Sequence, residues 1–278
     1  MLQFRCSAAI CSRAVSLRES RSRIASTLRD LIVIAFVSGV REVGNKIYEH
    51  AFPVYRLCYR VFKAHTDRAE RRLLKRILSA GDVVVDVGAN IGIYSQFLSR
   101  CVSLTGLVHS FEPSPDNFKH LQSATGKLGN VRLSQVAVGE YSGRSKLYLS
   151  DKLNVDHRTY ATQGDSRGIL EIDIIALDDY FKPGQRVDLI KMDIQGYELH
   201  ALRGANRLLA DNPNIKLLLE LWPYGLKQAG ANWFELIDTL QAKNMSIYQI
   251  TNHGLLPFRS DSVKQSPDWY VNLFAAPK

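Results

Sequence analysis

The stretch Asp86-Val87-Gly88-Ala89-Asn90-Ile91-Gly92 closes an apolar run that begins at residue 82, and a segment of helical periodicity over 93–103 follows it. This order predicts a buried strand, a tight turn and a helix. Doubly wound α/β folds bind nucleotides at such a turn. Glycine lets the backbone turn sharply and approach a ligand closely, and the start of a helix offers unpaired N–H groups. We therefore expect a ligand site here.

From residue 82 onward, short apolar runs alternate with helical segments. Strands are predicted at 82–87, 107–111, 131–137, 187–192, 215–221, 246–250 and 270–274, and helices at 93–103, 115–128, 198–210 and 232–243. Strands that are apolar almost throughout are typical of a parallel sheet covered by helices on both faces. The last two strands have no helix between them, which favours antiparallel pairing. The predicted fold is a doubly wound, seven-stranded, mostly parallel α/β sheet with a terminal antiparallel hairpin.

An insertion over residues 138–181 interrupts this alternation. It carries two further strand-like pieces, at 145–149 and 170–175. It lies between two strand–helix units, where it can form a lid over a bound ligand.

Charge is distributed unevenly along the 278 residues. The formal net charge is +9, but residues 1–76 hold 16 Lys/Arg against 6 Asp/Glu, whereas residues 77–278 hold 20 against 21. A domain that binds nucleic acid needs a basic face. The nearly neutral larger part therefore argues against a nucleic-acid acceptor.

The N-terminal region divides into two predicted parts. Residues 1–29 form an Arg/Ser-rich arm, which is typical of an organellar transit peptide or of a basic segment with little stable structure. Residues 30–80 form a helical extension. Its apolar run Leu31–Val37 is about half the ~20 residues that span a bilayer, which predicts a buried or interfacial helix. The α/β domain covers 81–278.

The helical pattern over residues 53–78 has one strongly basic surface. A solvated helix face explains this pattern, and so does weak contact with an anionic membrane surface. Four cysteines (Cys6, Cys11, Cys58 and Cys101) form no C-x-x-C pair and no zinc-binding spacing. This usage favours a reducing compartment, so we expect a cytoplasmic protein, or an imported one if the arm is a transit peptide.

The turn after residue 86 departs from the dinucleotide fingerprint. G-x-G-x-x-G would need glycine where Asn90 and Ile93 stand, so an NAD or FAD site is disfavoured. Glu112 follows the predicted strand 107–111, at the place where doubly wound folds set a carboxylate against ribose hydroxyls. Together the two features indicate a ribose-bearing cofactor without a pyrophosphate.

Two groups of motifs carry a resemblance to a known family. The run from Asp86 to Gly92 followed by Phe111-Glu112-Pro113 resembles class I methyltransferases that use S-adenosylmethionine. Ile190-Lys191-Met192-Asp193-Ile194-Gln195-Gly196-Tyr197-Glu198 and Leu202-Arg203-Gly204-Ala205 are similar to the I-K-x-D-x-[EQ]-G-x-E…L-x-G-A signature of FkbM-type methyltransferases. Leu177-Asp178-Asp179 and Leu219-Glu220 also fit. The resemblance covers roughly residues 66–275 and implies a Rossmann-like methyltransferase with S-adenosyl-L-methionine as cofactor.

The resemblance also implies roles for single residues toward this cofactor. It assigns the methionine and sulfonium side to Asp86, Gly88, Asn90 and Gly92, the ribose to Glu112, and the adenine surroundings to Pro113 and Ala137. An acid near the sulfonium is physically sensible because it offsets the positive charge.

Two residues are candidates for the chemistry. Asp193 follows the predicted strand 187–192, where it can take the proton of an acceptor hydroxyl or orient the acceptor. It can equally be a structural acid that orders the Gly196 turn and caps the next helix. His157 in the insertion is either a base or a solvated loop residue. Gln195 stands where many relatives carry Glu, so no metal site is expected.

Four residues are candidates for acceptor binding. Arg158 and Tyr160 lie in the insertion, and Glu220 and Trp222 end the predicted strand 215–221. They can contact a polar or glycosidic acceptor, or they can serve only as a cap and as packing.

The predicted function is methyl transfer from S-adenosylmethionine to a hydroxyl of a small-molecule or carbohydrate-like acceptor. Two alternatives remain. A catalytically inactive binding or scaffold protein would keep the fold without turnover, and retained S-adenosylhomocysteine would distinguish the two. A dehydrogenase would require NAD binding despite the interrupted glycine pattern.

Overall fold

A computed structural model of the chain describes Tyr48 and residues 50–148, 158–160 and 168–278. Contacts divide the chain into residues 1–55 and 56–278, and the second unit contains both sheets. The predictions for residues 1–29, for the run Leu31–Val37 and for His157 lie outside the described residues.

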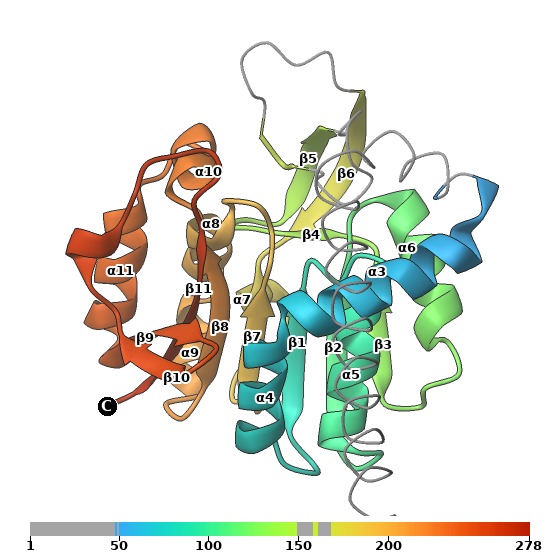
Figure 1. The fold of residues 1–278 in the computed structure, drawn as a ribbon, viewed down its shortest axis with the longest axis horizontal. Helices are drawn as coiled ribbons and strands as arrows, with labels where there is room; N and C mark the ends of the chain where they lie inside the picture. Colours follow the sequence, from blue (N-terminus) through green and yellow to red (C-terminus); the bar gives the residue numbers. More distant parts are fainter. Residues whose placement is uncertain (1–47, 49, 149–157, 161–167) are drawn as a thin grey trace, which may run out of the picture. The chain divides into compact units, whose positions relative to one another are not determined.

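The central sheet has eight strands in the order β10-β9-β11-β8-β7-β1-β2-β3 (Figure 1). Their bounds are β1 Val83–Val87, β2 Leu107–Phe111, β3 Val131–Ser134, β7 Leu189–Met192, β8 Lys216–Leu221, β9 Met245–Thr251, β10 Gly254–Pro257 and β11 Val271–Pro277. Strands β3, β2, β1, β7 and β8 are parallel, and β11 is antiparallel to both β8 and β9. The doubly wound, mostly parallel fold and the antiparallel pairing of the last two predicted strands are confirmed.

The predicted number of seven strands is one too low for this sheet. Strand β10 pairs antiparallel with β9 across a two-residue turn, with Gly254 opposite Thr251. The segment after Thr251 is rich in glycine, proline and serine, and Leu255-Leu256 is too short to be the apolar run that marks a buried strand. An edge strand such as β10 needs none, because its side chains are largely exposed: Leu256 is 54% exposed.

The insertion forms a second sheet in the order β4-β6-β5. Its strands are β4 Ala137–Val138, β5 Gly143–Tyr148 and β6 Ile169–Ile175, which confirms both predicted pieces. The strand predicted at 131–137 is divided, because its first part is β3 of the central sheet and its end is β4. A small core of Ala137, Leu147, Ile172 and Ile174 holds this sheet together.

Helices cover both faces of the central sheet (Figure 1). The described helices are α3 Phe52–Thr66, α4 Arg68–Ile77, α5 Ile93–Val102, α6 Pro115–Thr125, α7 Leu177–Tyr180, α8 Glu198–Arg203, α9 Asn206–Asp211, α10 Pro223–Gln228 and α11 Trp233–Ala242, with a short 3₁₀ turn at Ser260–Ser262. Neighbouring residues of β1 face opposite layers. Val85 packs in a core with Leu199 and Leu240, whereas Val84 packs in a core with Leu74 and Leu98.

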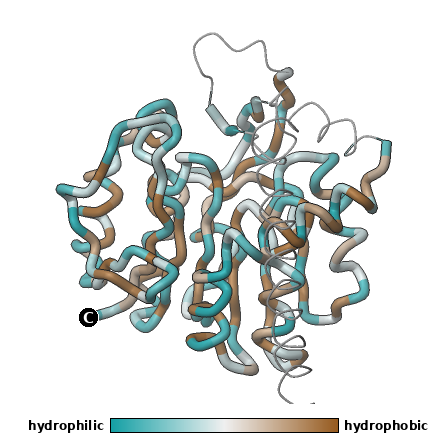
Figure 2. The backbone as a smooth tube through the Cα atoms, in the orientation of Figure 1, coloured by the Kyte–Doolittle hydropathy of each residue, from teal (hydrophilic) through white to brown (hydrophobic). Residues whose placement is uncertain are grey.

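The hydropathy pattern follows this layering, with apolar residues along the inner strands and mixed character along the helices (Figure 2). The helix predicted at 198–210 is divided into α8 and α9, with Gly204 and Ala205 between them. Gly204 packs closely on the backbone, because a Cβ there would lie 2.0 Å from the carbonyl oxygen of Gly139. The helical pattern over 53–78 is broken at Asp67, between α3 and α4. None of the helices described here is long and apolar enough to cross a lipid bilayer.

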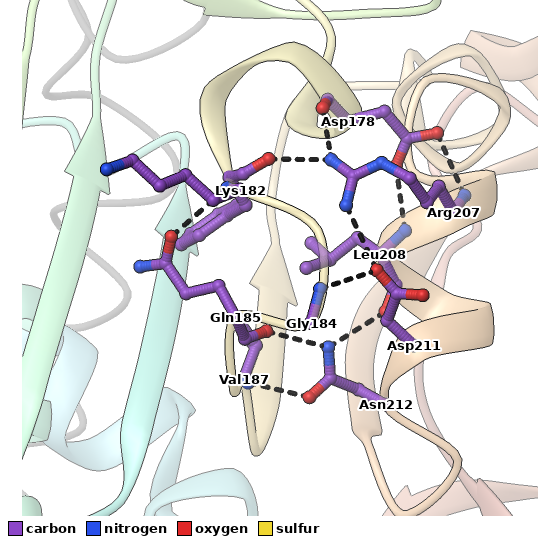
Figure 3. A network of polar contacts seen from close by, with 10 residues as sticks. Asp178, Lys182, Gly184, Gln185, Val187, Arg207, Leu208, Asp211 and Asn212 are labelled. Atoms are coloured by element: carbon purple, nitrogen blue, oxygen red, sulfur yellow. Dashed lines mark hydrogen bonds and ion pairs between the residues drawn. The ribbon is translucent and has the colours of Figure 1, made fainter.

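The Leu177-Asp178-Asp179 motif belongs to a polar network that holds the segment before β7 (Figure 3). The Asp178 carboxylate accepts hydrogen bonds from the backbone N–H groups of Arg207 (2.9 Å) and Leu208 (2.8 Å), at the start of α9. The Arg207 side chain donates to the carbonyl oxygen of Phe181 (2.6 Å), and the Asn212 side-chain oxygen accepts from the N–H of Val187 (2.9 Å). This part of the motif therefore positions the start of β7.

Candidate functional site

An open cavity lies at the carboxyl ends of β1, β2 and β7. Six of the predicted residues line it: Gly88, Asn90, Glu112, Pro113, Ala137 and Asp193. The structure therefore brings the predicted cofactor wall and the first catalytic candidate to one space, where doubly wound folds bind ligands.

The turn after β1 has a backbone that few residues other than glycine adopt. Gly88 has φ 78° and Asn90 has φ 50°. A Cβ on Gly88 would lie 2.2 Å from the carbonyl oxygen of Asp193, so the two loops touch through their backbones. Gly88 is thus required by the packing of the β1 and β7 loops as well as by its positive φ.

Asp86 and Gly92 do not line the cavity. Asp86 is fully buried behind the turn, where one carboxylate oxygen lies 3.2 Å from the Lys191 ammonium and the other accepts a 2.7 Å hydrogen bond from Ser95. Gly92 begins α5 with φ 85°, and a Cβ there would lie 3.0 Å from Leu121 of α6. Both residues support the turn from behind.

Glu112 is held by backbone donors. Its Oε2 accepts from the N–H of Asn90 (2.9 Å) and its Oε1 accepts from the N–H of Ser114 (3.0 Å). The side chain is 5% exposed, and this burial raises its pKa to about 7 although the N–H groups favour the ionised form. Each carboxylate oxygen accepts one such bond and retains a further lone pair for a ligand hydroxyl.

Asp193 follows β7, and its backbone N–H donates to the carbonyl oxygen of Val87 (3.1 Å). Burial opposes ionisation of its carboxyl group, but the ammonium groups of Lys191 and Lys63 outweigh this effect. They hold the pKa of Asp193 below its ordinary value. An ionised carboxylate therefore lies in the cavity wall, within 3.5 Å of the Gln195 amide nitrogen.

The turn after Asp193 is ordered by Glu198. Its Oε1 accepts hydrogen bonds from the N–H groups of Ile194 (3.2 Å) and Gly196 (3.3 Å). Gly196 has φ 96°, and a Cβ there would lie 2.3 Å from the Gly225 backbone. The structural role that the sequence left open for Asp193 is therefore performed by Glu198, whose burial raises its pKa to about 7.

None of the four acceptor candidates lines the cavity. The Arg158 guanidinium lies 4.9 Å from the centre of the Trp222 ring, and the Trp222 indole donates to the carbonyl oxygen of Pro267 (2.9 Å). The Tyr160 hydroxyl donates to the carbonyl oxygen of Gln195 (2.6 Å). Burial raises the pKa of Glu220, and the charges of Asp193 and Glu198 raise it further.

The sequence analysis missed residues that the structure places at the site. Thr159 lines the cavity, and its buried hydroxyl has no hydrogen-bond partner among the described residues. Lys191 and Lys63 lie with their ammonium groups 4.6 Å and 5.9 Å from the Tyr94 ring centre. Lys191 belongs to the quoted I-K-x-D motif, but no local signal connects Lys63 with Asp193, 130 positions later. Across the described ranges, no group of three or more His, Cys, Asp or Glu residues is placed to hold a metal ion.

Comparison with known proteins agrees with this geometry. A model of the family described as the Methyltransferase FkbM domain matches residues 86–245. "Methyltransferase 1" of Beauveria bassiana (strain ARSEF 2860) is 28% identical over 143 residues, which cover 44% of this chain and 57% of that protein. "Methyltransferase sdnD" of Sordaria araneosa is 25% identical over 162 residues, which cover 46% of this chain and 62% of that protein. The chain thus spans about three-fifths of the length of these curated relatives.

Solved structures of methyltransferases are also similar. A SAM-dependent O-methyltransferase from Thermotoga maritima has a TM-score of 0.43 and 14% identity, over 75% of this chain and 64% of that one. A methyltransferase from Geobacter sulfurreducens has a TM-score of 0.43 and 17% identity, over 92% and 96%. The family match covers more than half of the chain and includes the quoted I-K-x-D signature, so it confirms the resemblance drawn from the motifs. The chain belongs to the FkbM family of methyltransferases.

Proposed function

We propose that this chain transfers a methyl group from S-adenosylmethionine to a hydroxyl of a small-molecule or carbohydrate-like acceptor. One observation carries the proposal. The cavity has the backbone-held Glu112 carboxylate in one wall and the ionised Asp193 carboxylate in another. The first suits a ribose, and the second suits a reacting centre that is positively charged and must lose a proton.

The cavity residues fit this cofactor. Glu112 would accept hydrogen bonds from the two ribose hydroxyls, because its two oxygens are already oriented by Asn90 and Ser114. Pro113 and Ala137 would border the adenine, and the Gly88 turn would follow the methionine part. The buried Thr159 hydroxyl, which lacks a hydrogen-bond partner among the described residues, is a further group that a ligand would satisfy. When bound, S-adenosylmethionine supplies a methyl group on a positively charged sulfur.

The chain's own contribution is alignment and charge. Methyl transfer is an in-line displacement, so the walls must hold the acceptor oxygen, the methyl carbon and the sulfur in a row. Asp193 would offset the positive charge and would accept the hydroxyl proton through its carboxylate. Its low pKa keeps it ionised at neutral pH, which serves both roles. The apolar side chains of Val136, Val138 and Leu147 would exclude water from the reacting atoms.

The class of acceptor follows from charge and composition. Residues 77–278 have one more acidic than basic residue, which does not favour a polyanion such as nucleic acid. Arg158, whose guanidinium lies 4.9 Å from the centre of the buried Trp222 ring, would supply a polar edge to a sugar-like acceptor.

Calorimetric titration with S-adenosylhomocysteine tests the cofactor assignment. We expect micromolar binding, and Glu112→Ala should weaken it at least tenfold because two hydrogen bonds to an ionised group are lost. The control is Glu171→Ala, which removes an exposed acid from β6 and should leave the affinity unchanged. A folded, ligand-free protein that does not bind S-adenosylhomocysteine would favour the inactive scaffold, and unchanged affinity of Glu112→Ala would refute the ribose assignment.

The acceptor assignment needs a second measurement. Wild-type protein is incubated with methyl-labelled donor and fractionated small-molecule and glycan extracts, and the labelled product is analysed by NMR. A methyl ether supports O-methylation, and a methylated nitrogen or carbon overturns that part of the proposal.

A further inference from the structure

Helix α3 exposes an apolar stripe within the larger unit. Leu57 is 54% exposed and Val61 is 53% exposed, and Ala64 is also exposed. Residues at i, i+4 and i+7 lie on one side of a helix. A single exposed apolar residue needs no explanation, but a row of them on one helix marks a surface that contacts something.

The charged residues next to this stripe point in different directions according to their sign. Residues 56–76 contain eight Lys/Arg and only two acids, Asp67 and Glu70. Both acids point inward and are less than 9% exposed. Asp67 lies 2.9 Å from the Lys63 ammonium, and Glu70 accepts a 2.6 Å hydrogen bond from Asn272.

The charged residues that face outward are all cationic. The exposed charged residues of α3 and α4 are Arg60, Arg68, Arg72, Lys75 and Arg76. Within the described part of the chain, none of these five forms an ion pair with an acid. The exterior of this segment thus carries positive charge and apolar side chains and no exposed acid.

The core fixes this arrangement. Leu73, Leu74 and Leu78 are buried in the cluster that covers one face of the sheet. The Arg71 guanidinium lies 5.3 Å from the Tyr94 ring centre and 5.0 Å from that of Phe97. Because α4 is anchored by these contacts, it cannot rotate its cations inward.

We propose that the outer faces of α3 and α4, formed by Leu57, Val61 and the five exposed cations, dock on an anionic phospholipid membrane. A helix that lies in the interface inserts short apolar side chains between headgroups while Arg and Lys contact the phosphates. Each cation near an anionic surface adds to the attraction, and salt weakens that attraction. Nucleic acid would also attract the cations, but it offers no partner for Leu57 and Val61.

Co-sedimentation of the full chain with vesicles tests this surface. Vesicles of phosphatidylcholine with 30% phosphatidylglycerol are compared with vesicles of phosphatidylcholine alone. Each is measured at about 0.1 M and about 0.5 M salt; the Debye length is about 10 Å at the lower concentration and shorter at the higher one. We expect binding only to the anionic vesicles and a clear loss at high salt. Arg68→Glu/Arg72→Glu should reduce the partition coefficient at least tenfold, and Leu57→Ser/Val61→Ser should reduce it at least threefold.

Matched controls separate this surface from general charge and hydrophobicity. Lys182→Glu/Lys264→Glu reverses two exposed cations elsewhere, and Leu104→Ser removes a side chain that is 82% exposed. Both should bind like wild type, and circular dichroism establishes that every variant is folded.

Three results would overturn the proposal. The first is no binding of the wild type to anionic vesicles. The second is that the control and the test variants change the partition coefficient equally, or that none of them changes it. The third is a 20-base-pair duplex that binds more tightly than the vesicles at the same salt and is sensitive to Arg68→Glu/Arg72→Glu but not to Leu57→Ser/Val61→Ser.

Discussion

The two carboxylates of the cavity are set by different means. Glu112 is oriented by backbone N–H groups of Asn90 and Ser114, which belong to the loops that end β1 and β2. Asp193 is held in its charge state by side chains, the ammonium groups of Lys191 and Lys63. Glu112 is buried and Asp193 is partly buried, and the pKa is raised to about 7 in Glu112 and lowered in Asp193. Whole charges outweigh the cost of burial here, whereas N–H dipoles offset only part of it.

The position of the Glu112 carboxylate is therefore fixed by backbone geometry, whereas the charge state of Asp193 is fixed by neighbouring cations. The Glu112 wall depends on loop backbone, so it should be sensitive to changes in glycine and in backbone conformation. The charge state of Asp193 depends on the ammonium groups of Lys191 and Lys63, so it should be sensitive to charge substitutions at those positions.

The largest expected effect comes from Gly88→Ala, which adds a Cβ 2.2 Å from the Asp193 carbonyl oxygen at φ 78°. Because the β1 and β7 loops must then separate, we expect a loss of more than about 4 kcal/mol in the free energy of unfolding, measured with urea. Gly184→Ala is the control, since Gly184 has φ 70° with no atom within 4 Å of the added Cβ. It should cost only the ~1–2 kcal/mol of the left-handed backbone. Equal costs would show that the loops do not constrain each other.

Asp193→Asn removes the negative charge and keeps the shape of the side chain. If Asp193 accepts the hydroxyl proton, methyl transfer should fall at least about 100-fold, in the range of lost general-base catalysis. The rate is measured with an extract in which the wild type is active. S-adenosylhomocysteine affinity should change less than about threefold, which corresponds to less than ~0.7 kcal/mol. A large loss of affinity for S-adenosylhomocysteine at an unchanged rate would show that Asp193 binds the cofactor and is not the base.

Glu198 gives a dependence of stability on pH. Its carboxyl titrates near 4.5 when unfolded and near 7 when folded, so the unfolded chain loses this proton first. Stability should therefore fall as pH rises from about 4.5 to 7, and Glu198 should contribute about 2 kcal/mol of the loss between about pH 5.5 and 7.5. Urea unfolding of the wild type and of Glu198→Gln at both pH values measures this contribution as the difference between their slopes. Parallel slopes would contradict it.

Glu112 gives a dependence of affinity on pH. In the proposed site, ionised Glu112 would accept hydrogen bonds from both ribose hydroxyls, so binding of S-adenosylhomocysteine should tighten as pH rises through about 7. The ionised fraction rises about tenfold between pH 6 and 8, and the affinity should rise by up to that factor. Titration calorimetry at the two pH values measures the change. Glu112→Gln should show a flat profile, and a wild-type profile without slope would contradict the assignment.

The smallest expected effect is that of Tyr160→Phe. It removes the hydroxyl that donates to the Gln195 carbonyl oxygen at 2.6 Å. One such hydrogen bond contributes about 1 kcal/mol to stability, and thermal unfolding should report a loss of that size. Tyr141→Phe at a position that is 53% exposed should change stability by less than about 0.5 kcal/mol. A loss well above the predicted value would show that Tyr160 also positions the Gln195 turn.

Much of the cofactor wall could be predicted from the sequence because its determinants are local. A strand, a glycine turn and a helix occupy neighbouring positions, and Glu112 follows the next strand. The motif around Asp193 was also visible as a pattern. The pattern did not show that Glu198 orders the turn while Asp193 faces the cavity, because both are acids within six positions.

The strands of the fold also differ in how well the sequence predicted them. Buried strands have a strong apolar signal, so every parallel strand was predicted within a few residues. The edge strand β10 was missed because it has only four residues, and its Gly254 and Pro257 are typical of a turn.

The sequence by itself determined the doubly wound sheet, the family signature and the position of Glu112. These depend on side-chain periodicity and on residues near one another in the chain. Only the tertiary structure decided that Asp86 pairs with Lys191, that Gly88 must admit the Asp193 carbonyl and that Lys63 of α3 acts on the charge of Asp193. The physical reason is that Coulomb and contact energies depend on distance in space, and segments more than 100 positions apart meet only when the sheet has formed.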